Sequence, residues 1–458
     1  MANAATTLDL GAQRSATIFA KVRRKAWGGF AVLAVVFLYL AYTWNAFDVS
    51  GLLAKAEPDR ALILGTDSVA HKVHVVKSLR SGELEIAIEG ERTSRYDTPP
   101  PWVALPDDER VLVDLGEDHT AEIIGNRVLF TVPGYGTIEA EATADGVETR
   151  LPGPQPEWAR GNPRKLDARP TLGKRVQISR SKIEVHRYFF GWENFFFPFN
   201  SPLSQMSFGE LTDLAFSSER LDPDYSNAGY IFDTFWSNPD WQHGAVFVAL
   251  LETILMAVLG TFTAAFVGLP LAFLAASNFT PSQVLRFFVR RVFDFLRGID
   301  MLIWSLIFIR AFGLGPLTGA LAIAFTDTGT LGKLFSEALE NIDNKQVEGV
   351  RSTGANRLQR YRFGVIPQIL PIFVSQGLYY LESNTRSATV IGALGAGGIG
   401  LLLVETMRTA RDWENTLYII VLVVILVMIM DSASSWLRRK LIAGREDRRT
   451  RAAEASAS

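Results

Sequence analysis

The chain of 458 residues contains no cysteine. This absence excludes disulfide bonds, thiolate metal sites and cysteine nucleophiles. Histidine is also scarce, and only His71 and His74 lie close together in the sequence. A β-strand would turn these two side chains to opposite faces, because they are three positions apart. We therefore expect neither a metal site nor a catalytic centre, and we interpret every histidine as a surface or packing residue, namely His71, His74, His119, His186 and His243.

The chain also lacks a Walker nucleotide-binding motif. The stretch GTLGKL at 329–334 has the wrong glycine spacing, and no serine or threonine follows its lysine. We therefore expect no bound nucleotide, no other cofactor and no enzymatic activity in this chain.

Charge and hydrophobicity are distributed unevenly along the sequence. Residues 46–240 hold 20 basic and 31 acidic residues, whereas the remainder holds 26 basic and 17 acidic residues. Long apolar runs occur only before and after 46–240. A basic surplus beside apolar runs is typical of loops on the cytoplasmic side of a membrane and not of nucleic-acid binding.

Six apolar runs predict membrane-spanning helices. The first run follows basic residues and is bracketed by Trp27 and Trp44, a start that is also typical of a signal peptide. It is longer than a usual signal core and no small-residue cleavage site follows it, so a retained helix is favoured. The third and fourth runs are short and contain polar residues. The six predicted spans are 26–44, 244–277, 299–312, 317–336, 364–384 and 416–437.

The distribution of Lys and Arg predicts the orientation. The segments 1–25, 278–297, 333–362 and 438–458 hold 5, 4, 6 and 7 of them, whereas 313–316 holds none and 385–415 holds three. The positive-inside bias then predicts a multi-pass protein of the bacterial inner membrane with both termini in the cytoplasm. The predicted parts are a cytoplasmic N-terminus (1–25), a first transmembrane helix (26–45), a periplasmic region (46–240), a helical core (241–440) and a disordered cytoplasmic tail (441–458).

The periplasmic region is expected to be rich in β-structure. Alternating apolar and polar residues predict antiparallel strands, and Asp145-Gly146 is typical of a tight turn between two of them. The aromatic segment 186–206 is expected either to pack against this domain or to lie at the membrane interface. The acidic surplus favours a docking or stabilising role over the capture of an anion. The alternating runs are 71–76, 84–90, 110–116, 121–132 and 137–143.

A polar loop interrupts the apolar core at 343–367. It contains four arginines within the stretch VEGVRSTGANRLQRYRFGVIPQILP at 347–371 and cannot lie in hydrocarbon. Asp343 is suited to cap a short helix, Gly354 to form a turn, and Pro367 to open the next helix. The pattern predicts a helix–turn–helix that meets a soluble partner, and the alternative is a solvated connector.

Two stretches of this core resemble a known family. Glu348, Gly354 and Pro367 have the spacing of the coupling-loop pattern E-A-A-x3-G-x9-I-x-L-P of ABC importer permeases, although Gly349, Val350, Gly364 and Ile366 depart from it. The stretch YYLESNTRSATVIGALGAGGIGLLL at 379–403 resembles the phosphonate ABC-importer permease family. The resemblance covers about 240–440 and leaves the N-terminal domain outside the usual pattern.

This resemblance implies an α-helical type I importer permease core of about six spans, with the β-rich periplasmic domain inserted after the first helix. It implies import of phosphonate, phosphite or phosphate by alternating access. The implied partners are a separate ATPase that holds ATP and Mg, a periplasmic substrate-binding protein, a second permease and membrane lipid. The implied ATPase-coupling residues are Glu348, Arg351, Gly354, Arg357 and Pro367.

An ionisable side chain at membrane depth is costly and is a candidate to face a substrate pathway, so we expect the pathway near Arg386, whose guanidinium fork suits phosphoryl oxygens. Glu382 lies four residues earlier on the same helix face, and the alternative is that it only neutralises Arg386. The expected pathway residues are Glu382, Ser383, Asn384, Arg386 and Ser387.

The glycine-rich run 392–400 is expected to bring backbones close at the pore axis or to form a re-entrant turn, and the alternative is ordinary packing of small residues between helices. Its residues of interest are Gly392, Gly395, Gly397, Gly398 and Gly400. We interpret three other charges, Asp300, Arg310 and Asp431, as helix-end or packing charges.

Two other functions remain alternatives. One is a permease for another small solute such as methionine, and the second is a membrane receptor with a periplasmic sensor. A receptor would carry a cytoplasmic output domain, whereas only a short charged tail follows Leu441. The anion-binding character of Arg386 favours a phosphorus oxyanion over methionine.

Overall fold

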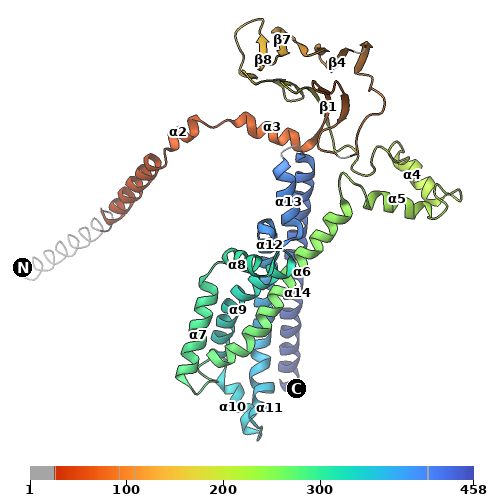
Figure 1. The fold of residues 1–458 in the computed structure, drawn as a ribbon. Helices are drawn as coiled ribbons and strands as arrows, with labels where there is room; N and C mark the ends of the chain where they lie inside the picture. Colours follow the sequence, from red (N-terminus) through yellow and green to blue (C-terminus); the bar gives the residue numbers. More distant parts are fainter. Residues whose placement is uncertain (1–24, 26, 92, 108, 410–411, 458) are drawn as a thin grey trace, which may run out of the picture. The chain divides into compact units, whose positions relative to one another are not determined.

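The computed structural model describes residue 25 and residues 27–91, 93–107, 109–409 and 412–457 (Figure 1). The chain divides into two compact units, one up to Leu64 and one from Gly65 onward. The first unit contains a 20-residue helix, Trp27–Ala46, that is long and apolar enough to cross a membrane. This helix agrees with the predicted span 26–44. The predicted cytoplasmic N-terminus, apart from Lys25, lies outside the described residues.

Two short helices follow the first helix. The side chain of Asp48 accepts a hydrogen bond from Gly51 N and so caps α2 (Val49–Ala54). The next helix, α3 (Pro58–Val69), runs directly into the first strand of the second unit.

The second unit begins with two antiparallel sheets of six strands each. The first sheet has the order β2-β1-β12-β11-β10-β9 and consists of β1 (Ala70–Ser78), β2 (Leu84–Ile88), β9 (Ala159–Asn162), β10 (Lys165–Thr171), β11 (Lys174–Ser179) and β12 (Lys182–Phe190). The second sheet follows the chain order and consists of β3 (Val103–Asp107), β4 (Arg110–Gly116), β5 (His119–Ile124), β6 (Arg127–Val132), β7 (Gly136–Ala142) and β8 (Val147–Arg150).

The two sheets share one apolar core. Alternate residues such as Val75 and Val185 of the first sheet and Ile123 and Phe130 of the second are buried in a single cluster. Such a cluster is the core of a β-sandwich, in which each strand turns every second side chain inward. The predicted β-rich region and its alternating runs are confirmed, except that the run 121–132 forms two strands, β5 and β6, instead of one.

The segment between the sandwich and the helical core contains two short helices, α4 (Phe208–Phe216) and α5 (Asn227–Trp236). Its aromatic start contacts both neighbours. Trp192 Nε1 donates to Ser68 O at 3.1 Å, and the Trp192 ring lies 5.3 Å from the Trp241 ring. The aromatic segment therefore packs against the end of α3, next to the sandwich, and against the start of the helical core.

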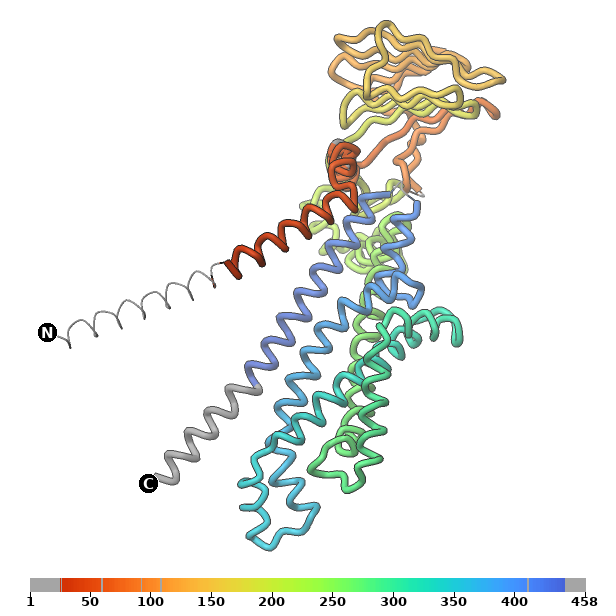
Figure 2. The backbone as a smooth tube through the Cα atoms, turned by 90° about the vertical axis from the view of Figure 1, so that its left-hand side faces the viewer, coloured from red at the N-terminus to blue at the C-terminus, as the bar shows by residue number. Residues whose placement is uncertain are grey.

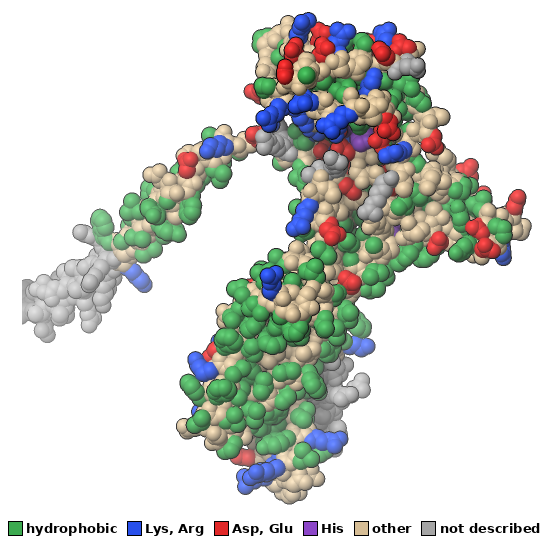
Figure 3. Space-filling view, in the orientation of Figure 1, with side chains coloured by type: hydrophobic (Ala, Val, Ile, Leu, Met, Phe, Trp, Pro, Cys, Tyr) green, Lys and Arg blue, Asp and Glu red, His purple; other side chains and the backbone are tan. Residues whose placement is uncertain are grey.

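The helical core follows the aromatic segment. It consists of α6 (His243–Ala275), α7 (Gln283–Gly298), α8 (Met301–Phe312), α9 (Pro316–Glu340), α10 (Asn344–Ser352), α11 (Arg357–Arg360), α12 (Ile366–Ile391), α13 (Gly398–Thr409) and α14 (Trp413–Ala457). Hydrophobic side chains cover much of its surface (Figure 3), as expected for a surface that faces lipid.

Each of the six predicted spans falls on a helix of the structure. Among the described residues, the helices long and apolar enough to cross a membrane are Trp27–Ala46, His243–Ala275, Arg357–Ala396 and Trp413–Lys440. The predicted span 299–312 forms α8, whose 12 residues reach only about 18 Å. The predicted span 317–336 lies in the 25-residue helix α9, which is too polar to be among the four.

Two further predicted segments overlap helices. The predicted cytoplasmic segment 278–297 is largely occupied by α7, a 16-residue amphipathic helix with its charged residues on one face and its apolar residues on the opposite face. The predicted disordered tail, 441–458, follows the span Trp413–Lys440 of α14 and stays a prediction.

Small residues bring α6 and α9 close together. A Cβ on Gly260 of α6 would lie 2.7 Å from Ile323 Cβ of α9, and a Cβ on Gly268 would lie 3.3 Å from Gly332 N. Such close approach is typical of helices that associate within a membrane. It positions the polar side chains of α6 and α9 next to α12.

Candidate functional site

A buried polar contact joins three helices of the core. Asn384 on α12 donates from Nδ2 to Thr261 Oγ1 of α6 at 2.8 Å and to Asp327 Oδ2 of α9 at 2.6 Å. All three residues are buried. A carboxylate buried in a helical core is costly unless hydrogen bonds compensate it, so Asn384 stabilises the position of Asp327.

A second polar contact lies on the face of α12 that carries Glu382 and Arg386. The two side chains approach to 3.7 Å, as their four-residue spacing predicts. Glu382 also accepts a hydrogen bond of 3.2 Å from Arg438 of α14. The Glu382 side chain is largely covered, whereas the Arg386 side chain is 57% exposed. The three residues together carry one net positive charge.

The predicted pathway residues therefore do not gather at one place. Glu382 and Arg386 occupy one face of α12, and Asn384 faces α6 and α9 on the opposite side. Ser383 and Ser387 are half-buried on the same helix. Sequence reasoning missed Asp327, Thr261 and Arg438, since each is distant in sequence from α12 and only Asp327 is a charge inside an apolar run.

The glycine-rich run breaks the helix that α12 begins. A π-helical turn at Gly392–Ala396 ends in glycines with positive φ, namely 114° at Gly395, 86° at Gly397 and 69° at Gly398. Only glycine adopts these conformations without strain. Figures 1 and 2 both show α13 continuing beyond the break, away from α10 and α11. The run is therefore an interruption between two helical pieces.

Backbone atoms approach closely at this break. A Cβ on Gly400 would lie 1.9 Å from Thr389 O, and a Cβ on Gly392 would lie 2.3 Å from Gly397 O. Packing against another helix accompanies this close backbone approach, because a Cβ on Gly398 would lie 2.5 Å from Thr253 Oγ1 of α6.

Side chains of α6 satisfy the backbone that the break exposes. Glu252 Oε2 accepts a hydrogen bond from Gly398 N at 2.9 Å, and Thr253 Oγ1 accepts one from Ile399 N at 2.9 Å. Glu252, Gly397 and Gly398 also line a cavity of about 530 Å³. Interrupted helices within membranes are tolerated where such partners replace the lost backbone hydrogen bonds.

The polar loop forms a compact motif at one end of the helical core. Asp343 caps α10 by accepting a hydrogen bond from Lys345 N at 2.9 Å, and Gly354 has a φ of 81° in the turn before α11. Pro367 lies in the first turn of α12. These three local predictions are confirmed. In Figures 1 and 2 the motif lies at the end of the core opposite the sandwich.

The predicted coupling residues are all exposed on this motif, namely Glu348, Arg351, Gly354, Arg357 and Pro367. Two apolar side chains of the same motif are also exposed, namely Leu358 at 75% and Phe363 at 60%. Exposed apolar side chains with charged neighbours are typical of a protein-binding surface. Figure 3 shows Lys and Arg side chains gathered at this end of the molecule.

Of the three remaining charges, two lie at helix ends as predicted. Asp300 caps α8 by accepting a hydrogen bond from Leu302 N at 2.8 Å, and Arg310 lies in the last turn of the same helix. Asp431 differs, because it lies within α14 with an exposed side chain.

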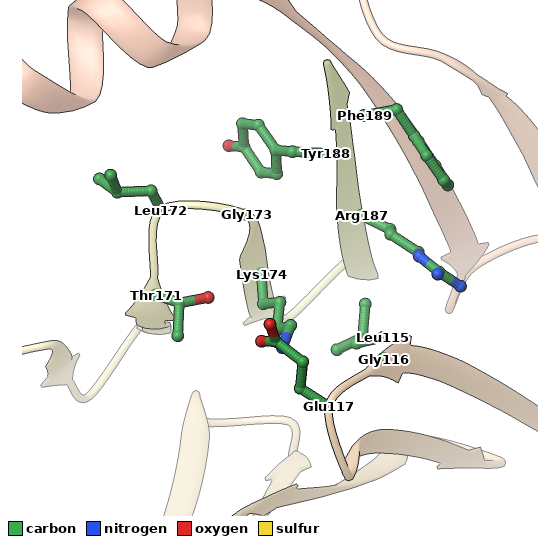
Figure 4. Close-up of a pocket in the computed structure, with 10 residues that line it drawn as sticks. All are labelled: Leu115, Gly116, Glu117, Thr171, Leu172, Gly173, Lys174, Arg187, Tyr188 and Phe189. Atoms are coloured by element: carbon green, nitrogen blue, oxygen red, sulfur yellow. The ribbon is translucent and has the colours of Figure 1, made fainter.

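The sandwich also contains a cavity of about 630 Å³ (Figure 4). Lys174 and Glu117 of its lining point toward one another and form an ion pair. Arg187 of the same lining donates to Asp114 O at 2.9 Å.

The comparisons with known proteins concern the helical core. Residues 268–443 match the model of the family described as binding-protein-dependent transport system inner membrane component. The phosphite transport system permease PtxC of Stutzerimonas stutzeri is 34% identical over 223 residues, which is 49% of this chain and 75% of that protein. The cryptic phosphonate transport system permease PhnE2 of Escherichia coli K12 is 46% identical over 122 residues, which is 27% of this chain and 99% of that protein.

A third relative is matched over a smaller share of its length. The phosphate-import permease PhnE of Mycolicibacterium smegmatis is 38% identical over 192 residues, which is 42% of this chain and 36% of that protein. This chain therefore matches about a third of the length of the mycobacterial permease. All three relatives are named as transport permeases.

Helices long and apolar enough to cross a membrane agree with a family of inner-membrane proteins. The chain is therefore a multi-pass inner-membrane protein, and it belongs to the phosphonate ABC-importer permease family.

Proposed function

We propose that this chain is the permease subunit of an ATP-binding-cassette importer that moves phosphonate, phosphite or phosphate from the periplasm to the cytoplasm. A separate ATPase subunit hydrolyses ATP with Mg, and a periplasmic binding protein delivers the substrate. The relatives described above are named for the transport of phosphate, phosphite and phosphonate, which supports this class of substrate.

The observation that carries the proposal is the exposure of Arg386. A charged side chain within a membrane-spanning helix is expensive unless it faces protein or water. The Arg386 side chain is 57% exposed in the single chain, so its guanidinium needs a further covering. A second permease subunit, with a water-filled pathway between the two copies, would give the guanidinium both protein and water to face.

The charge balance around Arg386 suits an anion. Glu382 lies beside both Arg386 and Arg438, so one carboxylate is shared between two guanidinium groups. Two copies of the chain would bring two net positive charges to the pathway. Arginine binds phosphoryl oxygens with two parallel hydrogen bonds, whereas a neutral solute gains little from this charge.

The coupling loop, defined as 343–367, is the proposed contact with the ATPase. Its charged residues Glu348, Arg351 and Arg357 are exposed, and Leu358 and Phe363 supply an apolar surface beside them. Gly364 packs directly against α10, because a Cβ at that position would lie 3.2 Å from Val347 Cα. This close contact would make the apolar surface and α10 move as one body. Motion of the ATPase would therefore reach α12 directly through the loop.

Alternating access requires a point at which α12 and α13 can change their relative position. The break at 392–397 supplies one, since glycines with positive φ interrupt the helix beside Glu252 and Thr253. Rearrangement of a few glycine dihedrals at such a hinge can open one end of a pathway and close the opposite end.

The proposed orientation places the coupling loop and both termini in the cytoplasm and the sandwich in the periplasm. Asp240 is the link between the sandwich and the outer helix ends. It accepts a hydrogen bond from Thr93 N at 3.1 Å, and its carbonyl oxygen accepts one from Asn415 Nδ2 at 3.2 Å. The sandwich is thus tied to the ends of α6 and α14 that lie away from the coupling loop.

The test is the ATPase activity of the permease reconstituted with its ATPase and its binding protein. Methylphosphonate, 2-aminoethylphosphonate, phosphite, phosphate and methionine would be supplied one at a time. Stimulation by at least one phosphorus oxyanion, and not by methionine, is expected. Stimulation by methionine alone would contradict the proposed substrate class and leave only the importer fold.

A further inference from the structure

Three neighbouring strands bring two histidines and a glutamate to one face of the first sheet. His74 of β1 pairs with His186 of β12 and with Ala87 of β2 in the antiparallel registers. Paired residues on adjacent strands turn their side chains to the same face, and Glu89, two residues after Ala87, shares that face. The opposite face carries Val73, Val75 and Val185 into the sandwich core.

The ligating atoms of these three residues are close enough to hold one metal ion. A nitrogen of His74, a nitrogen of His186 and a carboxylate oxygen of Glu89 all lie within 4.8 Å of one another. His186 Nε2 lies 3.5 Å from Glu89 Oε2, and the two imidazole rings meet edge to face with centroids 6.0 Å apart. Imidazole and carboxylate are the ligands of many zinc sites with two histidines and one glutamate.

The two imidazoles also have an unsatisfied hydrogen-bonding atom each. His186 is only 2% exposed, and within the described residues its Nδ1 has no hydrogen-bond partner. The Nδ1 atom of His74 is likewise buried without a partner there. A buried polar atom of this kind costs about 1–3 kcal/mol unless something compensates it. Metal coordination by these rings would fix which nitrogen carries the proton and order their surroundings.

Acidic side chains outnumber basic ones in the described lining of the cavity next to the three residues. His74 and Glu89 line a space of about 800 Å³ between the sandwich and the start of α6. The basic side chains in the described part of its lining, Arg95 and Lys182, pair with Glu85 at 2.8 Å and Glu184 at 2.6 Å. Further acids in the same lining are Glu89, Glu91, Asp240, Glu405 and Asp412.

We propose that His74, His186 and Glu89 form a binding site for a divalent transition-metal ion of the zinc class. Water in the cavity would complete the coordination, since the three residues leave at least one position open. Imidazole ligands favour zinc, copper and nickel over magnesium or calcium, which prefer oxygen ligands alone. This proposal is independent of the proposed transport function.

Metal binding would stabilise the edge of the first sheet. The three ligands come from β1, β12 and the residue just after β2, so one ion would cross-link three strands. The free energy of binding adds to the free energy of unfolding when the unfolded chain does not bind the ion. The same sheet edge faces the cavity at the start of α6, where the sandwich meets the helical core.

The experiment is a metal titration of the purified full-length chain in detergent after treatment with a chelator. Zn²⁺ affinity would be measured by calorimetry, and Co²⁺ would report the ligand geometry through its visible absorption. One bound ion per chain is expected, with a tetrahedral Co²⁺ spectrum and an increase in melting temperature on addition of Zn²⁺.

The variants His74→Gln, His186→Gln and Glu89→Gln are each expected to weaken Zn²⁺ binding at least about tenfold, in the range found for changes around metal ligands. His119→Gln is the matched control, because its ring lies in the second sheet and its Nδ1 contacts Glu117 O at 2.8 Å. The control is expected to keep the Co²⁺ spectrum and the melting-temperature shift.

Unchanged Zn²⁺ affinity in Glu89→Gln and His74→Gln would overturn the proposal, as would a wild-type chain that binds no Co²⁺ with a tetrahedral spectrum. If His186→Gln does not fold, the two partly buried positions still decide the outcome, because both variants keep the shape of the side chain approximately.

Discussion

Asn384 and Asp327 form the contact that holds the middle of the helical core together. The amide nitrogen of Asn384 lies 2.6 Å from the Asp327 carboxylate, and the same nitrogen reaches Thr261 at 2.8 Å. One side chain thereby connects α6, α9 and α12. The contact lies on the face of α12 that is turned away from Arg386, so it fixes the position of α12 from the opposite side.

Replacement of Asn384 by Leu is expected to destabilise the protein. The Asp327 carboxylate would lose its hydrogen-bond donor while it stays buried, a loss that costs about 1–3 kcal/mol and more for a charged group. Thermal unfolding of the purified chain in detergent measures the change. Ser383→Ala on the same helix is the control and is expected to unfold like the wild type. Equal melting temperatures for Asn384→Leu and the control would show that the buried contact contributes nothing.

The second prediction concerns the close backbone contacts at the glycine break, 392–400. Gly400→Ala would place a Cβ 1.9 Å from Thr389 O, and a backbone atom cannot move aside as a flexible side chain can. Overpacking of this kind costs about 1–3 kcal/mol and occasionally more. We expect a large loss of folded protein in size-exclusion chromatography.

The matched control for Gly400→Ala is Gly377→Ala on α12, where an added Cβ meets no atom within 4 Å. Alanine is the better helix former, so the control is expected to fold as well as the wild type or better. If the two variants gave the same folded yield, the close backbone approach at the break would be wrong.

The coupling loop predicts where the ATPase binds. Glu348→Arg and Leu358→Asp would each disturb an exposed residue of the proposed contact without removing a buried group. A reversed charge in an interface meets like charge and costs several kcal/mol, so binding of the ATPase should weaken by about tenfold or more. Co-purification of the ATPase with the permease measures this.

Glu148→Arg is the control for the coupling loop, because Glu148 is an exposed residue of β8 in the sandwich. It is expected to bind the ATPase like the wild type. Normal ATPase binding by both coupling-loop variants would place the contact elsewhere.

Local signals explain why parts of the fold could be predicted. Asp343, Gly354 and Pro367 each act within one turn of their own helix, so a cap, a turn and a first-turn proline can be identified from neighbours alone. The alternating strands are equally local. By contrast, α7 was missed because four arginines within 278–297 resemble a solvated loop, although its apolar residues recur with a helical period.

The polar contacts of the core depend on residues far apart in the sequence. Asp327 and Thr261 meet Asn384 only after three helices have packed, and Arg438 reaches Glu382 from a helix 56 residues away. His74, Glu89 and His186 meet through strand pairing, and no short metal motif connects them. Periodicity and spacing describe single elements, whereas these contacts depend on how the elements pair.

The central claim is that the exposed guanidinium of Arg386 serves a phosphorus oxyanion. ATP-driven uptake of labelled phosphite, phosphate and methylphosphonate into proteoliposomes that contain the whole importer tests it most directly. The account predicts uptake of at least one of them by the wild type and by Arg310→Gln. It predicts a loss of about tenfold or more in Arg386→Gln, because a charge-assisted hydrogen bond is worth about 1.5–3 kcal/mol. Undiminished uptake by Arg386→Gln, with the complex fully assembled, would contradict the account.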